Sequence, residues 1–594
     1  MKNIDREKVK ITSGYLFEKQ ELNRKITVNA VYDRFKETGR VDAFRFEYKE
    51  GDAIVPHIFW DSDIAKWMEG AAYVIAAHDD ADIRAKIDEL VALIEKNQCE
   101  DGYFNIHFTV VEPELRFKGR GNHELYCAGH LMEAAVAISE CLGNTKLLEC
   151  MEKYADYIHR VFVVEGSADF LTPGHEEIEL ALIRMYRHTG KKKFLELARF
   201  FIEARGVSEV RSIYSQSHLP VREQKEAVGH CVRAMYLYTG MAMLAAETKD
   251  TELFDACSTL FEDTAERKMY VTGGLGSTHI GEAFTTPYDL PNDGAYTETC
   301  AGIGLMFFAR AMLESENKAA YADAIERALY NGVLSGLSLD GRSFFYENPL
   351  EINLSERFET ANGKRRFPAN RRVECFGCSC CPPNIVRLIA SLNEYIYGTD
   401  GDVLYVNQYA ASELSDGELR CVMSTDYPRD SRVKITPYGV SRVALRIPFW
   451  CDRFKLNKPY QLKNGYAFVE CDGSDIELEL DMTPRAVWAD PRVLRDAGRV
   501  CVMRGPVVYC AEGVDNGNNL HRFSVSADFG YTEMFDNEYG LPSLEVDAYE
   551  KVWSDPSLYS RKRPEKAEVR LKLIPYNAFA NREECDMAVW LIEE

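Results

Sequence analysis

The hydrophobic pattern of this chain changes its period once, near residue 397. Before that point, apolar residues recur at helical spacing, as Ile83, Ile87 and Leu90 do in one amphipathic stretch. Beyond it, they alternate with polar residues, as in the Ile-Glu-Leu-Glu-Leu run at 476–480. Because a helix-period pattern does not form strands, we expect a helical region followed by an all-β region.

The helical region holds many stretches of moderate length joined by short polar turns. We expect helices near 29–38, 63–78, 83–94, 123–141, 144–161, 175–188, 191–204, 227–247, 250–267, 296–314, 319–335 and 383–395. About a dozen helices in one block is the number that an (α/α)6 barrel of six hairpins needs. A helical solenoid is the alternative, but no repeat of fixed period is visible.

The β region is expected to form two β-sandwich domains. Its half-buried strands are separated by turn residues, such as Lys-Asn-Gly at 463–465 and Asp-Gly-Ser at 472–474. The predicted fold class is therefore multidomain α + β. We expect an (α/α)6 barrel at 6–396, a sandwich at 397–498 on which the extreme N-terminus packs, and a second sandwich at 499–594.

Length and charge limit the classes of function. The chain has 594 residues, 46% of them hydrophobic, and a formal net charge of -23. Nucleic acids bind to basic patches that neutralise phosphates, so no nucleic acid is expected as partner, and a neutral or cationic small ligand fits better. The N-terminus runs directly into charged residues, and no apolar run is long enough to span a bilayer. A cytoplasmic protein without a membrane partner is therefore expected.

Cysteines are concentrated in one short segment, Cys-Phe-Gly-Cys-Ser-Cys-Cys-Pro-Pro-Asn at 375–384. This segment holds four of the seventeen cysteines of the chain. Thiolates are the donors that select zinc or an iron–sulfur cluster, and clustered thiols can also be reactive. The segment therefore predicts first a metal site and second a reactive thiol.

More than one ligand set is compatible with these cysteines. Glu298 and Cys300 stand two residues apart at the start of a predicted helix. With Cys380 and Cys381 they would complete a set of one carboxylate and three thiolates, which zinc accepts tetrahedrally. Alternatively, the four cysteines of the 375–384 segment hold a structural zinc by themselves, or they merely pack together.

A glycine-rich stretch at 273–282 ends in a candidate acid. Its glycines suggest a phosphate-binding loop, but the Gly-Lys-Ser/Thr ending of such loops is absent. Glu282 precedes Ala283 and Phe284, and burial in such apolar surroundings would raise its pKa towards that of a general acid. An ordinary loop glutamate is the alternative.

Three histidines, His123, His175 and His230, stand at or near the starts of predicted helices. In an α/α barrel such positions fall on one rim, where polar side chains can hydrogen-bond to sugar hydroxyls. The alternative for each is a surface or capping residue.

Three motifs taken together resemble one enzyme family. Gly-Glu at 281–282, Glu-Thr-Cys at 298–300 and Phe-Gly-Cys-Ser-Cys-Cys-Pro at 376–382 are similar to the zinc-dependent, cysteine-nucleophile β-L-arabinofuranosidases of glycoside hydrolase family 127. Further similar stretches are Phe-Trp-Asp-Ser-Asp at 59–63, His-Glu-Leu-Tyr at 123–126 and Val-Met-Arg-Gly-Pro at 502–506. The resemblance spans nearly the whole chain, and Cys-x-Cys-Cys combined with Glu-x-Cys is its most specific part.

The resemblance implies the same order of domains and a role for several residues. Cys380 matches the nucleophile and Glu282 the general acid/base. The zinc ligands are matched by Glu298, Cys300, Cys380 and Cys381. The substrate-binding residues are matched by His123, His175, His230, Tyr346 and Cys378.

The activity that the resemblance implies is retaining exo-hydrolysis. L-Arabinose would leave short β-L-arabinofuranosides through a thioglycosyl intermediate on zinc-bound Cys380. Three thiolates and one carboxylate around Zn²⁺ leave a formal charge of about -2, which should weaken each zinc–sulfur bond and free Cys380 to react. The alternatives are the same machinery acting on another furanoside, an arabinopyranoside or a deoxy sugar, and a non-catalytic glycan-binding protein with a structural zinc. Similar proteins also suggest a homodimer through the β-sandwiches.

Overall fold

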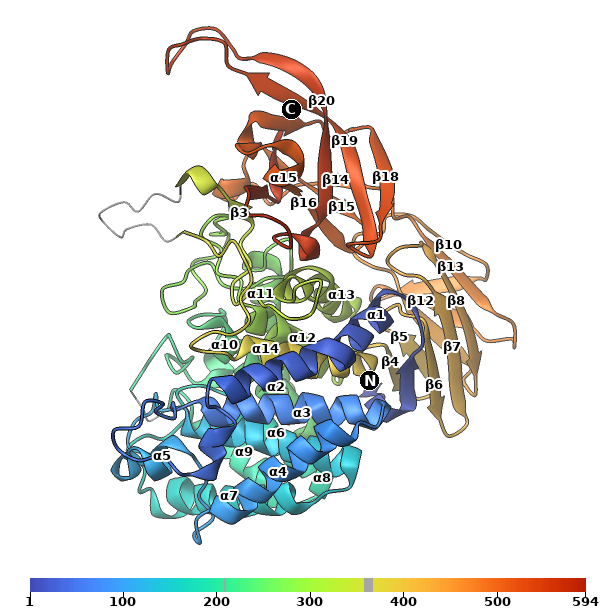
Figure 1. The fold of residues 1–594 in the computed structure, drawn as a ribbon. Coiled ribbons are helices and arrows are strands. Elements are labelled where there is room, and N and C mark those ends of the chain that lie inside the picture. The colour runs from blue at the N-terminus through green and yellow to red at the C-terminus, as the bar shows by residue number, and fades with distance from the viewer. Residues whose placement is uncertain (208–209, 357–366) are drawn as a thin grey trace.

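The computed structural model describes residues 1–207, 210–356 and 367–594. Figure 1 shows a helical body at the bottom of the view, one β-rich unit at its side and a second β-rich unit at its top. The order along the chain is the predicted one, with the helices first and two β-rich units after them. Among the described residues, no helix is both long and apolar enough to cross a lipid bilayer.

Six buried helices form a closed ring at the centre of the helical body. Each packs on the next, and the last packs on the first. The six are α3 (Trp60–Ala77), α6 (Glu124–Leu142), α8 (Ile178–Thr189), α10 (Cys231–Thr248), α12 (Thr299–Leu313) and α14 (Cys381–Ala390). Gly70 permits the contact that closes the ring, because a β-carbon there would lie 2.8 Å from the backbone nitrogen of Arg387.

Outer helices cover this ring. They are α2 (Val28–Glu37), α4 (Ala81–Asn97), α7 (Lys146–His159), α9 (Lys192–Ala204), α11 (Thr251–Arg267) and α13 (Ala319–Arg327). Five of them pack on the inner helix that precedes them, and α2 packs on α3 and α14. Each buries one apolar stripe, as α4 does with Ile83, Ile87 and Leu90. The predicted (α/α)6 barrel is confirmed.

One helix of the barrel was not predicted. α1 (Gly14–Leu22) continues through a π-helical turn at Asn23–Thr27 into α2. It buries only Tyr15 and Leu16, so it carries no apolar stripe of helical period that sequence reasoning could detect.

The inner helices begin at one end of the barrel, which we call the mouth. Each inner helix is paired with an outer helix that runs back, so successive inner helices run in the same direction. His123, His230, Glu298 and Cys380 directly precede α6, α10, α12 and α14. Candidate residues that are far apart in sequence therefore meet at the mouth.

The first β-rich unit is a sandwich of two six-stranded sheets, ordered β1-β4-β5-β9-β12-β11 and β10-β13-β8-β7-β6-β2. The strands after the barrel are β4 (Tyr397–Asp400), β5 (Val403–Val406), β6 (Ser412–Asp416), β7 (Leu419–Thr425), β8 (Arg432–Tyr438), β9 (Arg442–Arg446), β10 (Phe454–Leu456), β11 (Tyr460–Lys463), β12 (Tyr466–Glu470) and β13 (Ile476–Leu480). The extreme N-terminus adds β1 (Lys2–Asn3) to one sheet and β2 (Val9–Ile11) to the other.

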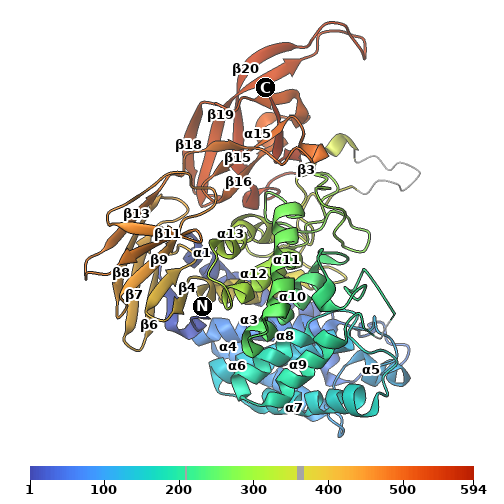
Figure 2. The ribbon, with the colours of Figure 1, turned by 180° about the vertical axis from the view of Figure 1, so that it is seen from behind.

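The second β-rich unit is one ten-stranded sheet. Its strands are β3 (Glu351–Ile352), β14 (Arg485–Val487), β15 (Arg499–Arg504), β16 (Val507–Glu512), β17 (Phe523–Val525), β18 (Tyr531–Asp536), β19 (Leu541–Val552), β20 (Glu565–Pro575), β21 (Met587–Ala588) and β22 (Trp590–Glu593). Because β15 also pairs with β16, the strands β15, β22, β17, β19, β20 and β16 form a closed ring within this sheet. Figure 2 shows the long β19–β20 hairpin projecting beyond the rest of this unit.

Candidate active site

Four potential metal ligands meet at the mouth. The sulfur of Cys300 lies 3.3 Å from that of Cys381 and 3.7 Å from that of Cys380. Cys380 and Cys381 are also 3.7 Å apart, and Oε1 of Glu298 lies 3.7 and 3.8 Å from their sulfurs. Ligands around a tetrahedral cation with metal–sulfur bonds of about 2.3 Å stand about 3.8 Å apart. The spacing of these four groups therefore fits a tetrahedral metal.

The charges of this cluster also fit a cation. Burial, followed by the charges of Cys380 and Glu282, raises the pKa of Glu298 well above its usual value. Burial and the neighbouring thiols of Cys300 and Cys380 likewise raise the pKa of Cys381. Oε2 of Glu298 is buried and has no hydrogen-bond partner. Acidic groups that repel one another and an unpartnered oxygen are what a bound metal ion would satisfy.

Helix starts help to hold negative charge in the cluster. Cys381 is the first residue of α14 and Cys300 the second residue of α12. The N-terminus of a helix carries partial positive charge, which stabilises an anion placed there. Burial opposes ionisation of Cys300, but the thiols of Cys380 and Cys381 beside it lower its pKa to about 6. The fold thus favours thiolate at this position.

The other two cysteines of the 375–384 segment lie outside the four-ligand group. The sulfur of Cys375 lies 3.2 Å from the hydroxyl of Ser379. Cys378 is exposed, and its sulfur lies 3.9 Å from the hydroxyl of Tyr346. That hydroxyl is also 3.5 Å from the sulfur of Cys380, so the structure places Tyr346 beside both thiols.

Glu282 lies next to this cluster in a strained turn. Its φ of 53° is in the left-handed region, which non-glycine residues rarely adopt, and the turn is closed by pairing of Thr278 with Ala283. Nε2 of His230 lies 2.7 Å from Oε2 of Glu282. Carboxylate oxygens of Glu282 and Glu298 lie within 4.8 Å of each other.

The expected pKa of Glu282 was wrong in direction. Burial does raise it, but the hydrogen bond from His230, aided by a hydrogen bond from Tyr296 and by the charge of Arg233, outweighs burial, and the pKa lies below its usual value. Nδ1 of His230 accepts a hydrogen bond from the backbone nitrogen of Val232, so Nε2 carries the proton and donates to Glu282. The sequence could not reveal this contact because His230 and Glu282 are 52 positions apart.

The three candidate histidines form a chain across the mouth. The ring centroids of His123 and His175 are 5.8 Å apart, and those of His175 and His230 are 5.5 Å apart. His175 and His230 are buried and His123 is half-buried. Burial and Arg233 lower the pKa of His123 to about 3 and that of His175 well below its usual value. Neutral imidazoles can both donate and accept hydrogen bonds, as recognition of sugar hydroxyls requires.

Arg40 is a positioning residue that sequence reasoning missed. It is buried, and its Nη2 donates to the carbonyl oxygens of Phe376 (3.1 Å) and Gly377 (2.9 Å). Its Nε donates to Asp63 at 2.9 Å. Arg40 therefore ties the cysteine segment to α3. No local motif marks it, since the carbonyl groups that it binds in the cysteine segment lie more than 300 positions away along the chain.

A second group of buried charges lies deeper in the barrel. Arg387 Nη1 lies 2.7 Å from a carboxylate oxygen of Glu69 and 2.7 Å from one of Glu133, and Arg184 contacts both carboxylates. We call these four residues the arginine-paired cluster. They line a cavity of about 330 Å³. Here the chain supplies its own cations.

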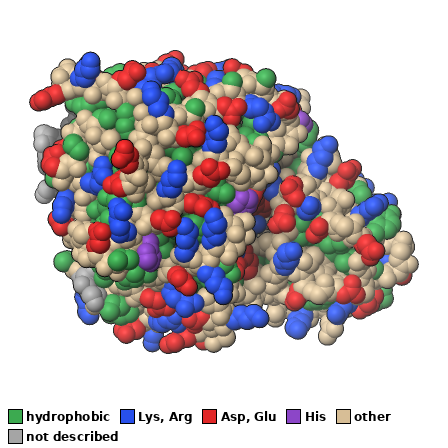
Figure 3. All heavy atoms as spheres, turned by 90° about the horizontal axis from the view of Figure 1, so that it is seen from below, with side chains coloured by type: hydrophobic (Ala, Val, Ile, Leu, Met, Phe, Trp, Pro, Cys, Tyr) green, Lys and Arg blue, Asp and Glu red, His purple; other side chains and the backbone are tan. Residues whose placement is uncertain are grey.

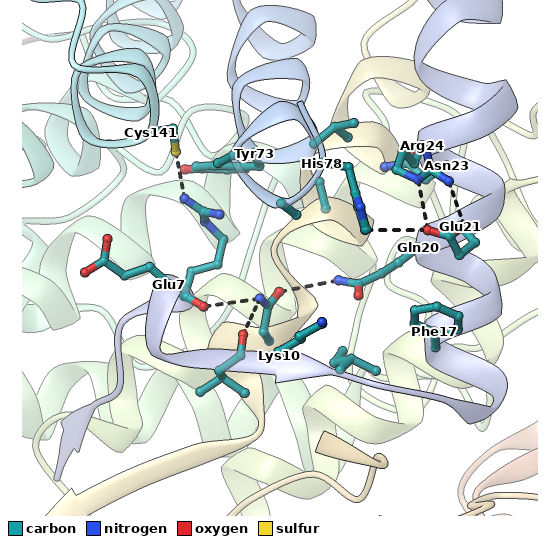
Figure 4. Close-up of a pocket in the computed structure, with 18 of the residues that line it drawn as sticks. Glu7, Lys10, Phe17, Gln20, Glu21, Asn23, Arg24, Tyr73, His78 and Cys141 are labelled. Carbon is teal, nitrogen blue, oxygen red and sulfur yellow. Dashed lines mark hydrogen bonds and ion pairs between the residues drawn. The ribbon is translucent and has the colours of Figure 1, made fainter. Parts of the chain in front are cut away.

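Another cavity, of about 390 Å³, lies between the N-terminal segment and the ends of α3 and α6 that face away from the mouth. Figure 3, the view from below, shows a hollow between the helical body and the first β-rich unit. In Figure 4, His78 and Arg24 both reach Glu21. Nη2 of Arg6 donates to the sulfur of Cys141 at 2.7 Å. These contacts join the N-terminus to the barrel, and none of the predicted site residues lines this cavity.

Comparisons with known proteins agree along most of the chain. A family model described as β-L-arabinofuranosidase, GH127 catalytic domain, matches residues 8–394, and a glycoside hydrolase family 127 C-terminal domain matches residues 484–592. A non-reducing end β-L-arabinofuranosidase of Bifidobacterium longum subsp. longum is 36% identical over 588 residues, covering 90% of this chain and 89% of that protein.

Two solved structures share the fold. One is a GH127 β-L-arabinofuranosidase from Geobacillus stearothermophilus T6, with 37% identity, a TM-score of 0.92, and coverage of 99% of this chain and 100% of that one. The other is a GH127 β-arabinofuranosidase with 33% identity, a TM-score of 0.89, and coverage of 100% of this chain and 98% of that one.

Proposed function

Because this chain belongs to glycoside hydrolase family 127, we propose that it is a retaining exo-hydrolase that releases L-arabinose from short β-L-arabinofuranosides. The observation that carries the proposal is the position of one thiol. Cys380 is half-buried at the start of α14, lies in the four-ligand cluster, and is within 3.5 Å of the Tyr346 hydroxyl. Ligand atoms of Cys380 and of Glu282 each lie within 4.8 Å of a Glu298 oxygen. A nucleophile and a carboxyl acid/base therefore share one site.

We propose Zn²⁺ as the metal, held by Glu298, Cys300, Cys380 and Cys381. Three sulfur donors and one carboxylate oxygen are a set that zinc binds tetrahedrally, and their spacing agrees with its bond lengths. When bound, Zn²⁺ supplies the positive charge that keeps neighbouring thiols ionised. The helix starts at α12 and α14 add to this effect.

In the first step, the Cys380 sulfur attacks the anomeric carbon, and the bond from that carbon to the glycosidic oxygen breaks. Glu282 gives its proton to the departing oxygen. The product of this step is a thioglycosyl intermediate on Cys380.

In the second step, the carboxylate of Glu282 takes a proton from water while the water oxygen attacks the anomeric carbon. The carbon–sulfur bond breaks and the thiolate returns. Two inversions at the same carbon retain its configuration. The His230 Nε2–H group favours the carboxylate form that this step needs.

Sugar recognition falls to the histidine chain and its neighbours. His123, His175 and His230 present neutral imidazoles to the mouth, and Nδ1 of His123 is buried without a hydrogen-bond partner. Tyr346 and Cys378 flank the nucleophile. We propose that these five residues bind the hydroxyls of the furanose ring.

Hydrolysis assays with product analysis test this function. The protein should hydrolyse a β-L-arabinofuranoside, leave the α-anomer and an arabinopyranoside intact, and release β-L-arabinose first, as NMR would show. Cys380→Ser and Glu282→Gln should each lose at least about a thousandfold in kcat/KM. Cys471→Ser, at a half-buried thiol of the first β-rich unit, is the matched control. Full activity in folded Cys380→Ser, or binding of the glycan without hydrolysis, contradicts the proposal.

We also propose that the chain forms a homodimer through the second β-rich unit. Leu558 and Tyr559, between β19 and β20, are 81% and 86% exposed, and Tyr531 and Phe535 on β18 are exposed as well. A contiguous exposed apolar patch marks an interaction surface, and we propose that the loop of Leu558 and Tyr559 contributes to one. The molar mass in solution should be that of two chains and should fall to one in a Leu558→Ser, Tyr559→Ser double variant. An unchanged mass, or a wild-type monomer, contradicts this interface.

We propose a cytoplasmic location, and the free thiols support it. All seventeen cysteines are free in the described part of the chain, including the three that would bind zinc. Such thiols persist in a reducing compartment. Recovery of the enzyme with cytoplasmic markers on cell fractionation is expected, and recovery with secreted proteins would refute it.

A further inference from the structure

Two exposed apolar side chains, Tyr214 and Ile280, lie beside Glu282. Ile280 is 74% exposed and belongs to the 278–283 turn that also holds Glu282. Tyr214 is 43% exposed, and a β-carbon on Gly281 would lie 3.5 Å from its ring. The phenol ring and the turn are therefore neighbours. We call Tyr214 and Ile280 the apolar platform.

The platform is built on the site residues and is held firmly. The backbone carbonyl of Tyr214 accepts a hydrogen bond from the backbone nitrogen of His230 at 3.2 Å. The ring of Tyr214 packs 5.7 Å from the His230 ring, and the Arg233 guanidinium carbon lies 4.3 Å from its centroid. Buried Gln216 anchors the same loop by donating to the carbonyl of Val228 at 2.7 Å. An aromatic surface is thus fixed in place and partly open to solvent.

We infer that Tyr214 and Ile280, the apolar platform, hold the leaving group when that group is a sugar ring. The inference rests on the proposed function. An acid/base must lie within about 3 Å of the glycosidic oxygen that it protonates, so the departing group lies on the Glu282 side of the bond. Apolar and aromatic side chains beside a reacting centre hold the apolar faces of ligands.

The size of the platform agrees with one ring. One phenol face and one isoleucine side chain can pack against the C–H groups of a single sugar, while hydroxyls at the ring edge stay in water. A methyl leaving group would reach neither side chain. The platform should therefore contribute binding energy only when the leaving group is a ring.

Kinetics with two substrates test the platform. We would compare a disaccharide of two L-arabinose units, the outer one β-linked, with methyl β-L-arabinofuranoside. Tyr214→Ala and Ile280→Ser should lower kcat/KM for the disaccharide roughly tenfold and change that for the methyl glycoside less than about twofold. Tyr214→Phe should keep the wild-type kcat/KM for the disaccharide. Leu494→Ser, which alters a 79% exposed apolar side chain away from the site, should change kcat/KM for neither substrate.

Equal losses on both substrates would overturn the inference, because they would report damage to the catalytic residues. No loss on the disaccharide would overturn it as well. Hydrolysis of neither substrate by the wild-type protein would instead contradict the proposed function.

Calorimetric titration distinguishes a failure of the platform inference from a failure of the proposed function. In the Glu282→Gln background, Tyr214→Ala should weaken disaccharide binding roughly tenfold and leave L-arabinose binding unchanged. Unchanged disaccharide affinity would overturn the platform whatever the kinetics show.

Discussion

The mouth and the arginine-paired cluster both bury several acidic groups, but they balance that charge differently. Deep in the barrel, Arg184 and Arg387 lie against Glu69 and Glu133, so each carboxylate has cations from the chain itself. At the mouth, three thiols and the Glu298 carboxylate face one another, and one oxygen of Glu298 has no partner.

This difference separates structural charge from functional charge. Buried ions that the chain pairs internally hold helices together, and removing one partner is costly. Buried acidic groups without a cation of their own need one from outside, and their pKa values shift accordingly. The acidic groups at the mouth could therefore hold a metal ion, whereas the arginine-paired cluster holds α3, α6, α8 and α14 around the barrel axis.

Removing the metal should have the largest effect. A chelator followed by desalting should lower hydrolysis by roughly a thousandfold or more, since Cys380 then loses the charge that keeps it ionised. Zn²⁺ should restore the rate, and Mg²⁺, which prefers oxygen ligands, should not. Metal content by elemental mass spectrometry would be followed alongside activity. Full activity in metal-free protein would show that the acidic groups of the mouth, like the arginine-paired cluster, need no external cation for function.

Breaking the arginine-paired cluster should affect stability next most strongly. Arg387→Met leaves Glu69 and Glu133 with one arginine instead of two, and the free energy of unfolding should fall by about 3–5 kcal/mol. Arg187→Met, at a more exposed ion pair with Glu247 and Glu314, should change it by no more than about 1 kcal/mol. Both values come from denaturant titrations, and equal effects would show that the deep pairs have no special role.

Arg40→Lys should weaken metal binding while the barrel stays folded. A lysine cannot donate at once to Asp63 and to the carbonyls of Phe376 and Gly377, so the cysteine segment loses its tie to α3. Zinc affinity should fall by about 10- to 100-fold in competition titrations. Arg34→Lys, at a partly exposed side chain that reaches Glu374, is the matched control. An unchanged zinc affinity in Arg40→Lys would show that Arg40 does not position the metal ligands.

The effect of Asp61 should appear as a pH dependence of stability. Burial raises its pKa to about 7, and its Oδ2 has no partner. The folded state therefore binds this proton more tightly than the unfolded state, and the free energy of unfolding should fall as pH rises from about 4 to 7. The free energy of unfolding of Asp61→Asn, measured relative to that of the wild type, should rise by at most about 1.4 kcal/mol per pH unit across this window. Denaturant titrations at each pH measure this difference, and equal pH dependence in the wild type and in Asp61→Asn would contradict the prediction.

The hydrophobic periodicity of the sequence predicted most of the helices and the change from helices to strands. The six inner helices were predicted to within a few residues, because their caps and apolar runs are local features. α1 was missed since its burial has no helical period. The single curled sheet of the second β-rich unit depends on long-range pairings, such as β3 from the barrel with β21, which no local pattern records.

Local chemistry identified candidate residues for the site, and tertiary contacts set their properties. The cysteine density of 375–384 and the Glu-x-Cys motif pointed to the four-ligand cluster. The sequence could not show that His230 lowers the pKa of Glu282, or that Arg40 holds Phe376 and Gly377. Each of these contacts joins segments that are far apart in the sequence and that meet only in the folded barrel.

The most direct test of the central claim is intact-mass spectrometry after brief exposure to an electrophilic L-arabinofuranose analogue, with peptide mapping of the product. Cys380→Ser and Glu282→Gln would be treated in parallel. The account predicts one label per chain, on Cys380, and none on Cys380→Ser. A label on another residue, or no label on protein that holds one zinc per chain, would contradict a metal-held thiol nucleophile at the mouth.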